Sequence, residues 1–264
     1  MLIYPEINPV AIQIGSIQIY WYALMYLSAF AFAWGLGRYR AWQSYRGWSD
    51  KQVDDLIFFA AIGVIVGGRV GYVLFYNTSA LWQDPLSLIR VWQGGMSFHG
   101  GLLGVITALG IFTYWQRKNF WDVADFIAPL APLGLGLGRI GNFINGELWG
   151  RVSDVPWAMI FPHVDEWPRH PSMLYEAILE GLILFVVIWW FSAKLKPRAA
   201  VTGLFLLTYG VLRFAVEFVR EPDRHLGFLW SWVTMGQLLS IPMIIGGIGL
   251  MIWAYQRESS CNNI

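Results

Sequence analysis

Long apolar stretches alternate with short polar connections along most of this 264-residue chain. A helix that spans a membrane needs about 20 mostly apolar residues. Seven stretches meet this requirement, and they cover residues 17–37, 56–76, 98–115, 122–140, 174–192, 202–218 and 234–254. Pro129 and Pro132 interrupt the fourth stretch, a break that neighbouring protein can accommodate inside a membrane. The pattern predicts an all-α polytopic membrane protein, with one integral membrane domain over residues 1–264.

The composition supports this class of protein. Hydrophobic residues make up 56% of the chain and charged residues 13%, whereas soluble domains carry about 25% charged residues. The net charge is +1 and there is no basic stripe, which argues against a nucleic-acid partner. The single cysteine, Cys261, lies in a polar tail and offers no disulfide framework. The four histidines lack metal-ligand spacing, so we expect no metal.

Basic residues are distributed unevenly between the two sets of connections, and this asymmetry predicts the orientation in the membrane. One set, with the C-terminal tail, holds Arg38, Arg40, Arg46, Lys51, Arg117, Lys118, Lys194, Lys196, Arg198 and Arg257. The other set holds Arg90, Arg151, Arg169, Arg220 and Arg224. The C-terminus is therefore expected in the cytoplasm and the N-terminus outside. The long polar connection over residues 142–172 then faces outside, as a small extracytoplasmic head.

Some residues are expected to serve the structure. Glycines at four-residue spacing allow helices to approach closely, and they occur at Gly63, Gly67 and Gly71, at Gly100 and Gly104, and at Gly134 and Gly138. Arg69 is interpreted as a structural or snorkelling arginine. Ser172 precedes the fifth apolar stretch and is expected to cap its helix.

Charges gather in the segment LGRIGNFINGELWGR, residues 137–151, at the edge of the fourth stretch. Arg139 and Asn142 share a helix face if the helix continues that far. Charges at membrane depth are costly and normally face a partner or a polar cavity. Two interpretations remain open from this segment alone. Arg139 and Glu147 form an internal ion pair, or the segment binds an anion.

The sixth stretch carries a polar stripe made of Tyr209, Arg213 and Glu217, which are spaced four residues apart. Arg213 and Glu217 could form a simple intrahelical pair. A paired arginine nevertheless keeps five donors in a planar fork, which suits a phosphate or a carboxylate. Because two separate stretches each carry an arginine, one shared anion is the favoured hypothesis.

His99 lies among glycines in GGMSFHGG, at the outer end of the third stretch. Histidine titrates near neutral pH, so His99 could act as a general base. A hydrogen-bonded structural histidine is the alternative. The chain offers no obvious nucleophile for a covalent route. The candidate chemistry is therefore direct transfer between two bound substrates, one of them an anionic lipid.

Seven segments in sequence order resemble one known family over nearly the whole chain. They are WYALMYL (21–27), GGRVGYVLFYN (67–77), VWQGGMSFHGG (91–101), DFIAPLAPLGLGLGR (125–139), GRIGNFINGELWGR (138–151), RHPSMLYE (169–176) and YGVLRFAVEFVREPD (209–223). They are similar to those of the bacterial prolipoprotein diacylglyceryl transferases. Met173 departs from the family pattern, which has glutamine there, and Ala23 stands where glycine is usual.

The resemblance implies a reaction. The diacylglyceryl group of phosphatidylglycerol is transferred to the thiol of the lipobox cysteine in the signal peptide of a preprolipoprotein. A thioether forms and glycerol phosphate leaves. The site would be a central lipid cavity near the outer face of the bacterial inner membrane. Membrane lipids surround it, and no metal or soluble cofactor is needed.

The resemblance also suggests roles for individual residues. Arg139 and Arg213 would stabilise the phosphate, and His99 would accept the thiol proton, unless the arginines lower the thiol pKa without a base. Substrate-binding roles fall to the remaining candidates, which are Tyr22, Asn142, Glu147, Gly150, Tyr209 and Glu217. An anion transporter or channel is the alternative function, because it would also place arginines in a cavity. It predicts an internal repeat, and the sequence shows none.

Overall fold

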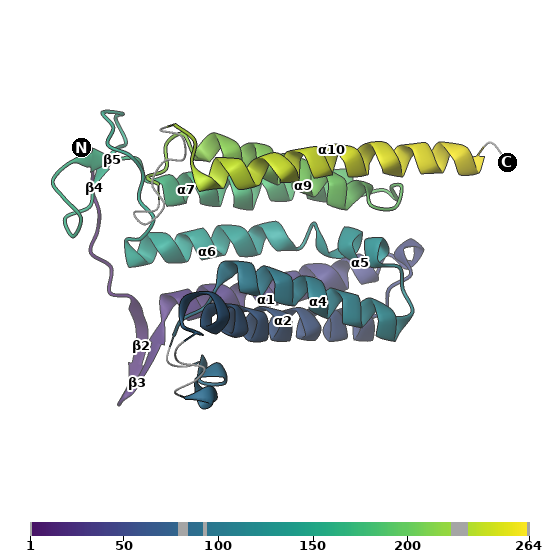
Figure 1. Ribbon diagram of the computed structural model, residues 1–264, viewed down its shortest axis with the longest axis horizontal. Helices are drawn as coiled ribbons and strands as arrows, with labels where there is room; N and C mark the ends of the chain where they lie inside the picture. Colours follow the sequence, from purple (N-terminus) through teal and green to yellow (C-terminus); the bar gives the residue numbers. More distant parts are fainter. Residues whose placement is uncertain (1, 79–83, 92–93, 223–231, 263–264) are drawn as a thin grey trace. The chain divides into compact units, whose positions relative to one another are not determined.

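The computed structural model describes residues 2–78, 84–91, 94–222 and 232–262, with side chains as far as residue 259 (Figure 1). The chain divides into two compact units. Unit 1 comprises Met1–Ala33 together with Asp125–Ile264, and unit 2 comprises Trp34–Ala124.

Helices dominate both units, and each of the seven apolar stretches contains one. Their bounds are Trp21–Ala41 (α1), Asp50–Tyr76 (α2), Phe98–Gln116 (α4), Phe120–Ile127 (α5), Ala131–Asn145 (α6), Ser172–Glu176 (α7), Leu184–Phe191 (α8), Ala200–Val216 (α9) and Met235–Asn262 (α10). A π-helix, η4 (Ala177–Ile183), joins α7 to α8 in one continuous span. Short 3-10 turns lie at Ser44–Arg46 (η1) and Pro85–Leu88 (η2).

Four of these helical spans are long and apolar enough to cross a membrane, or five if α5 and α6 together form one bent span. The pair is bent by 49° at the break between them, close to the two prolines. Only 17% of the apolar window of α10 is buried within the protein, so most of that surface suits lipid. The chain is therefore a polytopic membrane protein, and the number of seven crossings stays a prediction.

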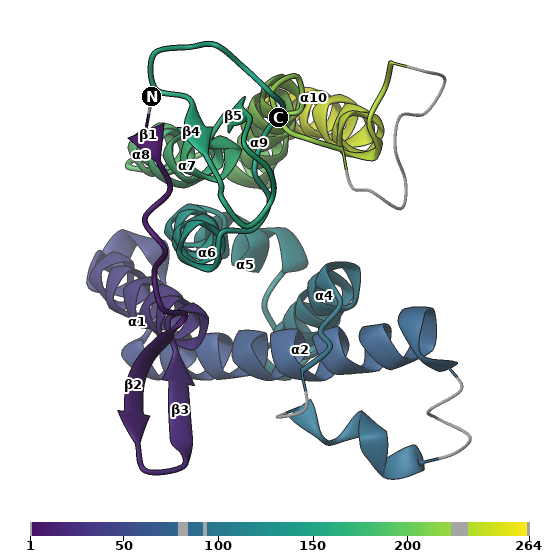
Figure 2. The same cartoon turned by 90° about the vertical axis from the view of Figure 1, so that its left-hand side faces the viewer.

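The prediction of an all-α chain is wrong at the N-terminus, where a β-hairpin precedes the first helix (Figure 2). Strands β2 (Val10–Ile14) and β3 (Ile17–Tyr20) pair in antiparallel fashion across a two-residue turn that contains Gly15 at φ +60°. The predicted span from residue 17 therefore starts four residues too early. Isoleucine and glutamine alternate here with the period of a strand, which the search for long apolar windows overlooked.

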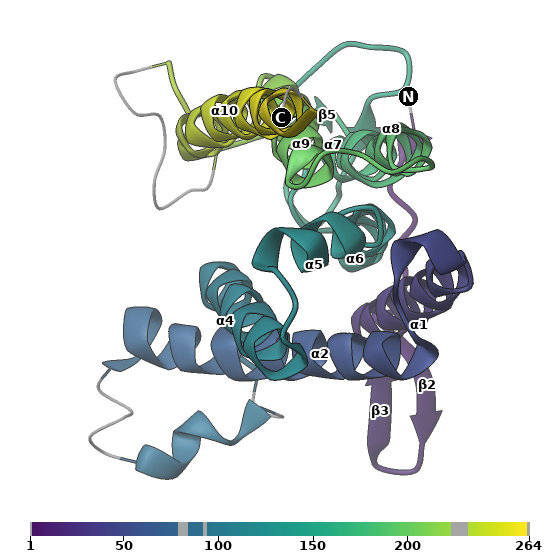
Figure 3. The same cartoon turned by 90° about the vertical axis from the view of Figure 1, so that its right-hand side faces the viewer.

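In unit 2 the helices α2 and α4 pack closely along glycines (Figure 3). A Cβ at Gly67 would collide with the backbone of Gly100 and Gly104, and a Cβ at Gly104 would collide with the carbonyl oxygen of Gly63. The expected packing role of these glycines is therefore confirmed. α2 begins at Asp50 because Ser49 and Gln52 form a capping box there.

Arg69 has a structural role, which confirms the first of its two predicted roles, structural or snorkelling. Its side chain is buried in unit 2 and donates to the carbonyl oxygens of Ser87, Gly94 and Gly95. The guanidinium thus secures the segments that follow α2.

In unit 1 the close contact between the backbones of α6 and η4 is made by Gly136 rather than by the predicted Gly134 or Gly138. A Cβ at Gly136 would lie 3.0 Å from the Cα of Gly181 in η4. Among the described residues, a Cβ at Gly138 would meet nothing within 4 Å, and one at Gly134 would touch only Ala29. The close approach brings η4 against α6. α10 packs along α9 (Figure 1).

The connection between α6 and α7 folds as a small head with its own core. The strands β4 (Met159–Ile160) and β5 (Pro168–Arg169) form a three-stranded sheet with β1 (Leu2–Ile3), in the order β1-β4-β5. Tyr4, Met159, Phe161 and Met173 pack together as a buried cluster. Met173, which departs from the family pattern, is thus a core residue of this head.

Candidate functional site

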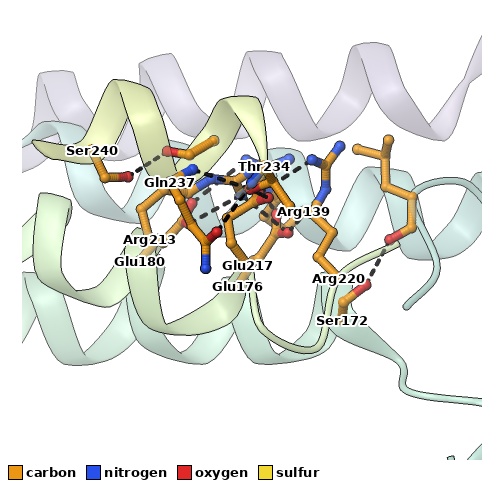
Figure 4. Close-up of polar contacts among 12 residues, drawn as sticks. Arg139, Ser172, Glu176, Glu180, Arg213, Glu217, Arg220, Thr234, Gln237 and Ser240 are labelled. Carbon is orange, nitrogen blue, oxygen red and sulfur yellow. Dashed lines mark hydrogen bonds and ion pairs between the residues drawn. The ribbon is translucent and has the colours of Figure 1, made fainter. Parts of the chain in front are cut away.

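Six charged side chains of unit 1 form one network, called the charged cluster below (Figure 4). Its members are Arg139, Arg213, Arg220, Glu176, Glu180 and Glu217. They come from α6, α7, η4, α9 and the turn that follows α9. The three carboxylates have no solvent exposure, while the exposed fractions of the arginine side chains are 22% for Arg139, 13% for Arg213 and 9% for Arg220. Three positive and three negative charges balance, which lowers the cost of burying them.

Arg139 reaches two of these carboxylates. Its Nε lies 2.6 Å from Oε2 of Glu176, and its Nη2 lies 3.5 Å from Oε2 of Glu180. The hypothesis of an Arg139–Glu147 pair is therefore wrong. α6 ends at Gly146 in the left-handed conformation (φ +67°), and the exposed Glu147 beyond it accepts a 2.7 Å hydrogen bond from Asn145.

Arg213 is the centre of the cluster because it touches all three carboxylates. Nη1 lies 3.1 Å from Oε1 of Glu176 and 3.3 Å from Oε1 of Glu180, and Nη2 lies 2.5 Å from Oε1 of Glu217. The intrahelical pair Arg213–Glu217 is thus confirmed as one part of a larger network. Arg139 and Arg213 lie at the same site, as predicted, but the anions that they share in the structure are the carboxylates of Glu176 and Glu180.

Sequence reasoning missed Glu176, Glu180 and Arg220. A signal was available, because Glu176 and Glu180 are four residues apart in an apolar stretch and share one helix face. Arg220 lies beyond the end of α9, and its Nη1 returns to Oε1 of Glu217 at 3.2 Å. Its position in the network depends on the fold and had no local signal.

The end of the charged segment is fixed by backbone contacts. The amide of Gly150 donates to the carbonyl oxygen of His170 at 2.8 Å, and a Cβ at Gly150 would lie 2.5 Å from the carbonyl oxygen of Val219. Close backbone approach therefore requires glycine at this position. The Arg151 guanidinium donates to the carbonyl oxygens of Glu217 and Arg220 at 3.1 and 3.0 Å, so it secures the turn that carries both cluster members.

Three predicted substrate-binding residues lie on or beside the helices that carry the charged cluster. They are Tyr22, Asn142 and Tyr209. Tyr22, at the start of α1, packs its ring against Gly141 of α6. Asn142 is buried on α6, three residues after Arg139. Tyr209 stacks on Phe205 with ring centroids 6.0 Å apart, one helical turn before Arg213. The fold thus brings Tyr22 to the helix of Arg139 and Tyr209 to the helix of Arg213.

His99 lies in unit 2, as the second residue of α4, and its side chain is exposed. A hollow in the same unit lies at the other end of α4 and is lined by Thr113, Tyr114, Trp115, Arg117 and Lys118. It contains none of the candidate residues. A role of His99 at the charged cluster therefore stays a prediction.

The expected capping role of Ser172 is wrong. The N-cap of α7 is Pro171, and the hydroxyl of Ser172 donates to the carbonyl oxygen of Leu148 at 2.8 Å. Ser172 therefore ties the start of α7 to the charged segment. The guanidinium of the neighbouring Arg169 stacks over the ring of Trp149 and forms an ion pair with Asp165. The hydrogen bond from Arg169 to Asp165 raises the pKa of Arg169.

His170 is expected to make the stability of the head depend on pH. Burial lowers the pKa of His170 below its usual value near 6.5. As the pH falls below about 6.5, the unfolded chain takes up this proton before the folded chain does, so the free energy of unfolding decreases. We expect the melting temperature of the wild type to fall more steeply than that of His170→Gln between pH 7.5 and pH 5. Parallel curves would contradict this assignment.

The fold and the site define a class: a polytopic membrane protein with a charge-balanced Arg–Glu cluster buried among its apolar helices. Comparison with known proteins identifies the family within this class. The model of the family described as prolipoprotein diacylglyceryl transferase matches residues 9–253. The chain belongs to this family and is a transferase.

Curated relatives match the chain along nearly its full length. The chain is 58% identical over 259 residues to the phosphatidylglycerol–prolipoprotein diacylglyceryl transferase of Coxiella burnetii, covering 98% of this chain and 99% of the relative. It is 57% identical over 262 residues to the enzyme of the same name from Methylococcus capsulatus, covering 98% and 100%. The counterpart from Pseudomonas paraeruginosa is 55% identical over 261 residues, covering 98% of each chain. These names support an enzyme over an anion transporter or channel.

Proposed function

We propose that this chain transfers the diacylglyceryl group of phosphatidylglycerol to the thiol of the lipobox cysteine of preprolipoproteins. The products are a thioether-linked lipoprotein precursor and glycerol phosphate. Family membership supports the reaction, as do the names of the relatives, which contain both substrates. The observation that carries the assignment of the site is the charged cluster, because a phosphate ester is the leaving group.

Arg139 is the cluster member best suited to receive the phosphate. It has the largest exposed fraction of the three arginines, 22%. Its Nε and Nη2 face Glu176 and Glu180, and within the described part of the chain its Nη1 has no partner. A guanidinium held by carboxylates on one edge can still donate from the other edge to an anion. Arg213 adds positive charge beside it through the two shared carboxylates.

The chemistry is a displacement at carbon. The thiol sulfur forms a bond to the terminal glyceryl carbon of the diacylglyceryl group, and the bond from that carbon to the phosphate oxygen breaks. Glycerol phosphate leaves with one additional negative charge, which Arg139 and Arg213 stabilise in the transition state. The thiol proton passes to His99. Asn142 and Glu147 position the head group, Tyr22 and Tyr209 shape the lipid pocket, Glu217 orients Arg213, and Gly150 lets the backbone approach closely.

The location of the site follows from the charge asymmetry of the connections. The enzyme lies in the bacterial inner membrane, with the N-terminus outside and the C-terminus in the cytoplasm. The head over residues 142–172 faces outside, and a central cavity opens to membrane lipids near that face. The signal peptide of the preprolipoprotein reaches the site there.

Purified protein in detergent, with phosphatidylglycerol and a synthetic lipobox peptide, tests the proposed reaction. We expect glycerol phosphate release that requires the peptide, together with a mass increase of the peptide by one diacylglyceryl group. A peptide with serine in place of the lipobox cysteine is the matched control and should give no release. Release without peptide would indicate a phospholipase, and no release from folded, monodisperse protein would reject the proposed reaction.

His99→Gln tests the proton acceptor. A general base contributes about 10²-fold or more to the rate. We expect kcat to fall about 10²-fold at pH 7, with a smaller deficit as the pH approaches the thiol pKa of about 8.5. The measurement is the rate of glycerol phosphate release as a function of pH. A deficit that is the same at every pH would assign His99 a structural role instead.

A further inference from the structure

We propose that Thr234, which immediately precedes α10, is a positioning residue for the reaction. Its hydroxyl holds the carboxylate of Glu217 and thereby sets the guanidinium of Arg213 (Figure 4). This inference rests on the proposed function, in which Arg213 stabilises the leaving phosphate.

The hydroxyl of Thr234 has one proton, and it donates that proton in a hydrogen bond to Glu217. Oγ1 of Thr234 donates to Oε2 of Glu217 at 2.6 Å, and both side chains are buried. The same Oγ1 accepts from the amide of Gln237 at 3.1 Å, and Oε1 of Gln237 accepts from the amide of Thr234 at 3.1 Å. This is a capping box. Because the amide of Gln237 occupies a lone pair of the hydroxyl, the proton is available for the carboxylate.

The start of α10 fits closely against the same carboxylate. A Cβ at Gly236 would lie 2.5 Å from Oε1 of Glu217 and 2.8 Å from Oε2. A side chain at this position would displace the carboxylate, so glycine lets Glu217 lie against the start of the helix. The N-terminus of a helix carries a partial positive charge, which attracts the carboxylate group of Glu217 at this point.

The two carboxylate oxygens of Glu217 therefore bind different partners. Oε2 is held by Thr234, while Oε1 receives Nη2 of Arg213 at 2.5 Å and Nη1 of Arg220 at 3.2 Å. Without the hydroxyl, the carboxylate can rotate and take Arg213 with it. Arg213 would then be less well placed beside Glu176, Glu180 and Arg139.

Three substitutions separate this role from capping alone. Thr234→Ser keeps both the cap and the donor, and Thr234→Val lacks both. Thr234→Asp keeps a good cap acceptor but cannot donate when ionised, and it places a negative charge beside Glu217. A role in capping alone predicts that the serine variant equals the wild type and that the valine variant loses stability but keeps the wild-type kcat per folded molecule. The positioning role predicts that only the serine variant keeps the wild-type kcat.

The experiment measures kcat and the KM for peptide at saturating phosphatidylglycerol, with rates normalised to folded protein from gel filtration. We expect kcat to fall about tenfold or more in Thr234→Val and Thr234→Asp, since a hydrogen bond to a charged group is lost. KM for the peptide should stay unchanged. Thr107→Val is the control, because among the described residues the hydroxyl of Thr107 bonds only to the carbonyl oxygen of Leu103 within its own helix.

Each outcome has one meaning. With an active wild type, a wild-type kcat in Thr234→Val or in Thr234→Asp overturns the positioning role, whereas an inactive wild type rejects the proposed function itself. If the valine and aspartate variants do not fold, Gly236→Ala decides, because it keeps the hydroxyl but displaces the carboxylate. A wild-type kcat in Gly236→Ala would then overturn the inference.

Discussion

Arg213→Ala is expected to abolish detectable transfer and to lower the free energy of unfolding by about 3–5 kcal/mol. The reason is that Arg213 contacts Glu176, Glu180 and Glu217, all of which have no solvent exposure. Removing the arginine leaves three buried carboxylates with two arginines. Activity is measured as glycerol phosphate release, and stability as the shift of the melting temperature in detergent.

A charge-balanced double variant separates stability from catalysis. Arg213→Met with Glu217→Gln removes one charge of each sign, so we expect it to regain much of the stability but none of the activity. Arg90→Ala is the control, because it breaks an ion pair with Asp84 in which both side chains are partly exposed, and such pairs contribute little. Substantial activity in either Arg213 variant would remove Arg213 from the proposed mechanism.

Gly104→Ala is expected to destabilise unit 2 by about 3 kcal/mol. The added Cβ would collide with the carbonyl oxygen of Gly63 and lie 2.8 Å from the Cα of Gly67. Both contacts are with backbone, so the helices α2 and α4 must separate. The melting temperature of the purified variant, with the yield of monodisperse protein, measures the effect.

The same helix offers the matched control. A Cβ at Gly110 would meet no described atom within 4 Å. Gly110→Ala should therefore be neutral or stabilising by up to about 1 kcal/mol, through the better helix propensity of alanine. Equal melting temperatures for the two variants would mean that the close packing of α2 and α4 does not contribute to stability.

The helices could be predicted because a long apolar window is a local property of the sequence. The same search missed the hairpin, since its strands are short and its Ile–Gln alternation has a different period. The charged cluster was predicted only in part. The stripe of Tyr209, Arg213 and Glu217 follows from helical spacing, whereas the partner of Arg139 does not.

The choice of Glu176 over Glu147 as the partner of Arg139 depends on tertiary packing. It requires Gly136 and Gly181 to bring α6 against η4, and Gly146 to turn the chain away from the helix axis. π-Helices are rare and often lie at functional sites, and the apolar pattern of residues 174–192 predicts an ordinary helix where η4 lies. Arg220 and Thr234 likewise reach Glu217 only after the chain has folded around the end of α9.

The small sheet of the head has a consequence for biosynthesis. Its first strand pairs Leu2 with Met159 in parallel register, so the two partners are separated by more than half of the chain. At a translation rate of about 5–20 residues per second, the first strand waits roughly 8 to 30 s for its partner. During that time the aromatic ring of Tyr4 has no core to enter. The head therefore closes only after the helices between its strands have been synthesised.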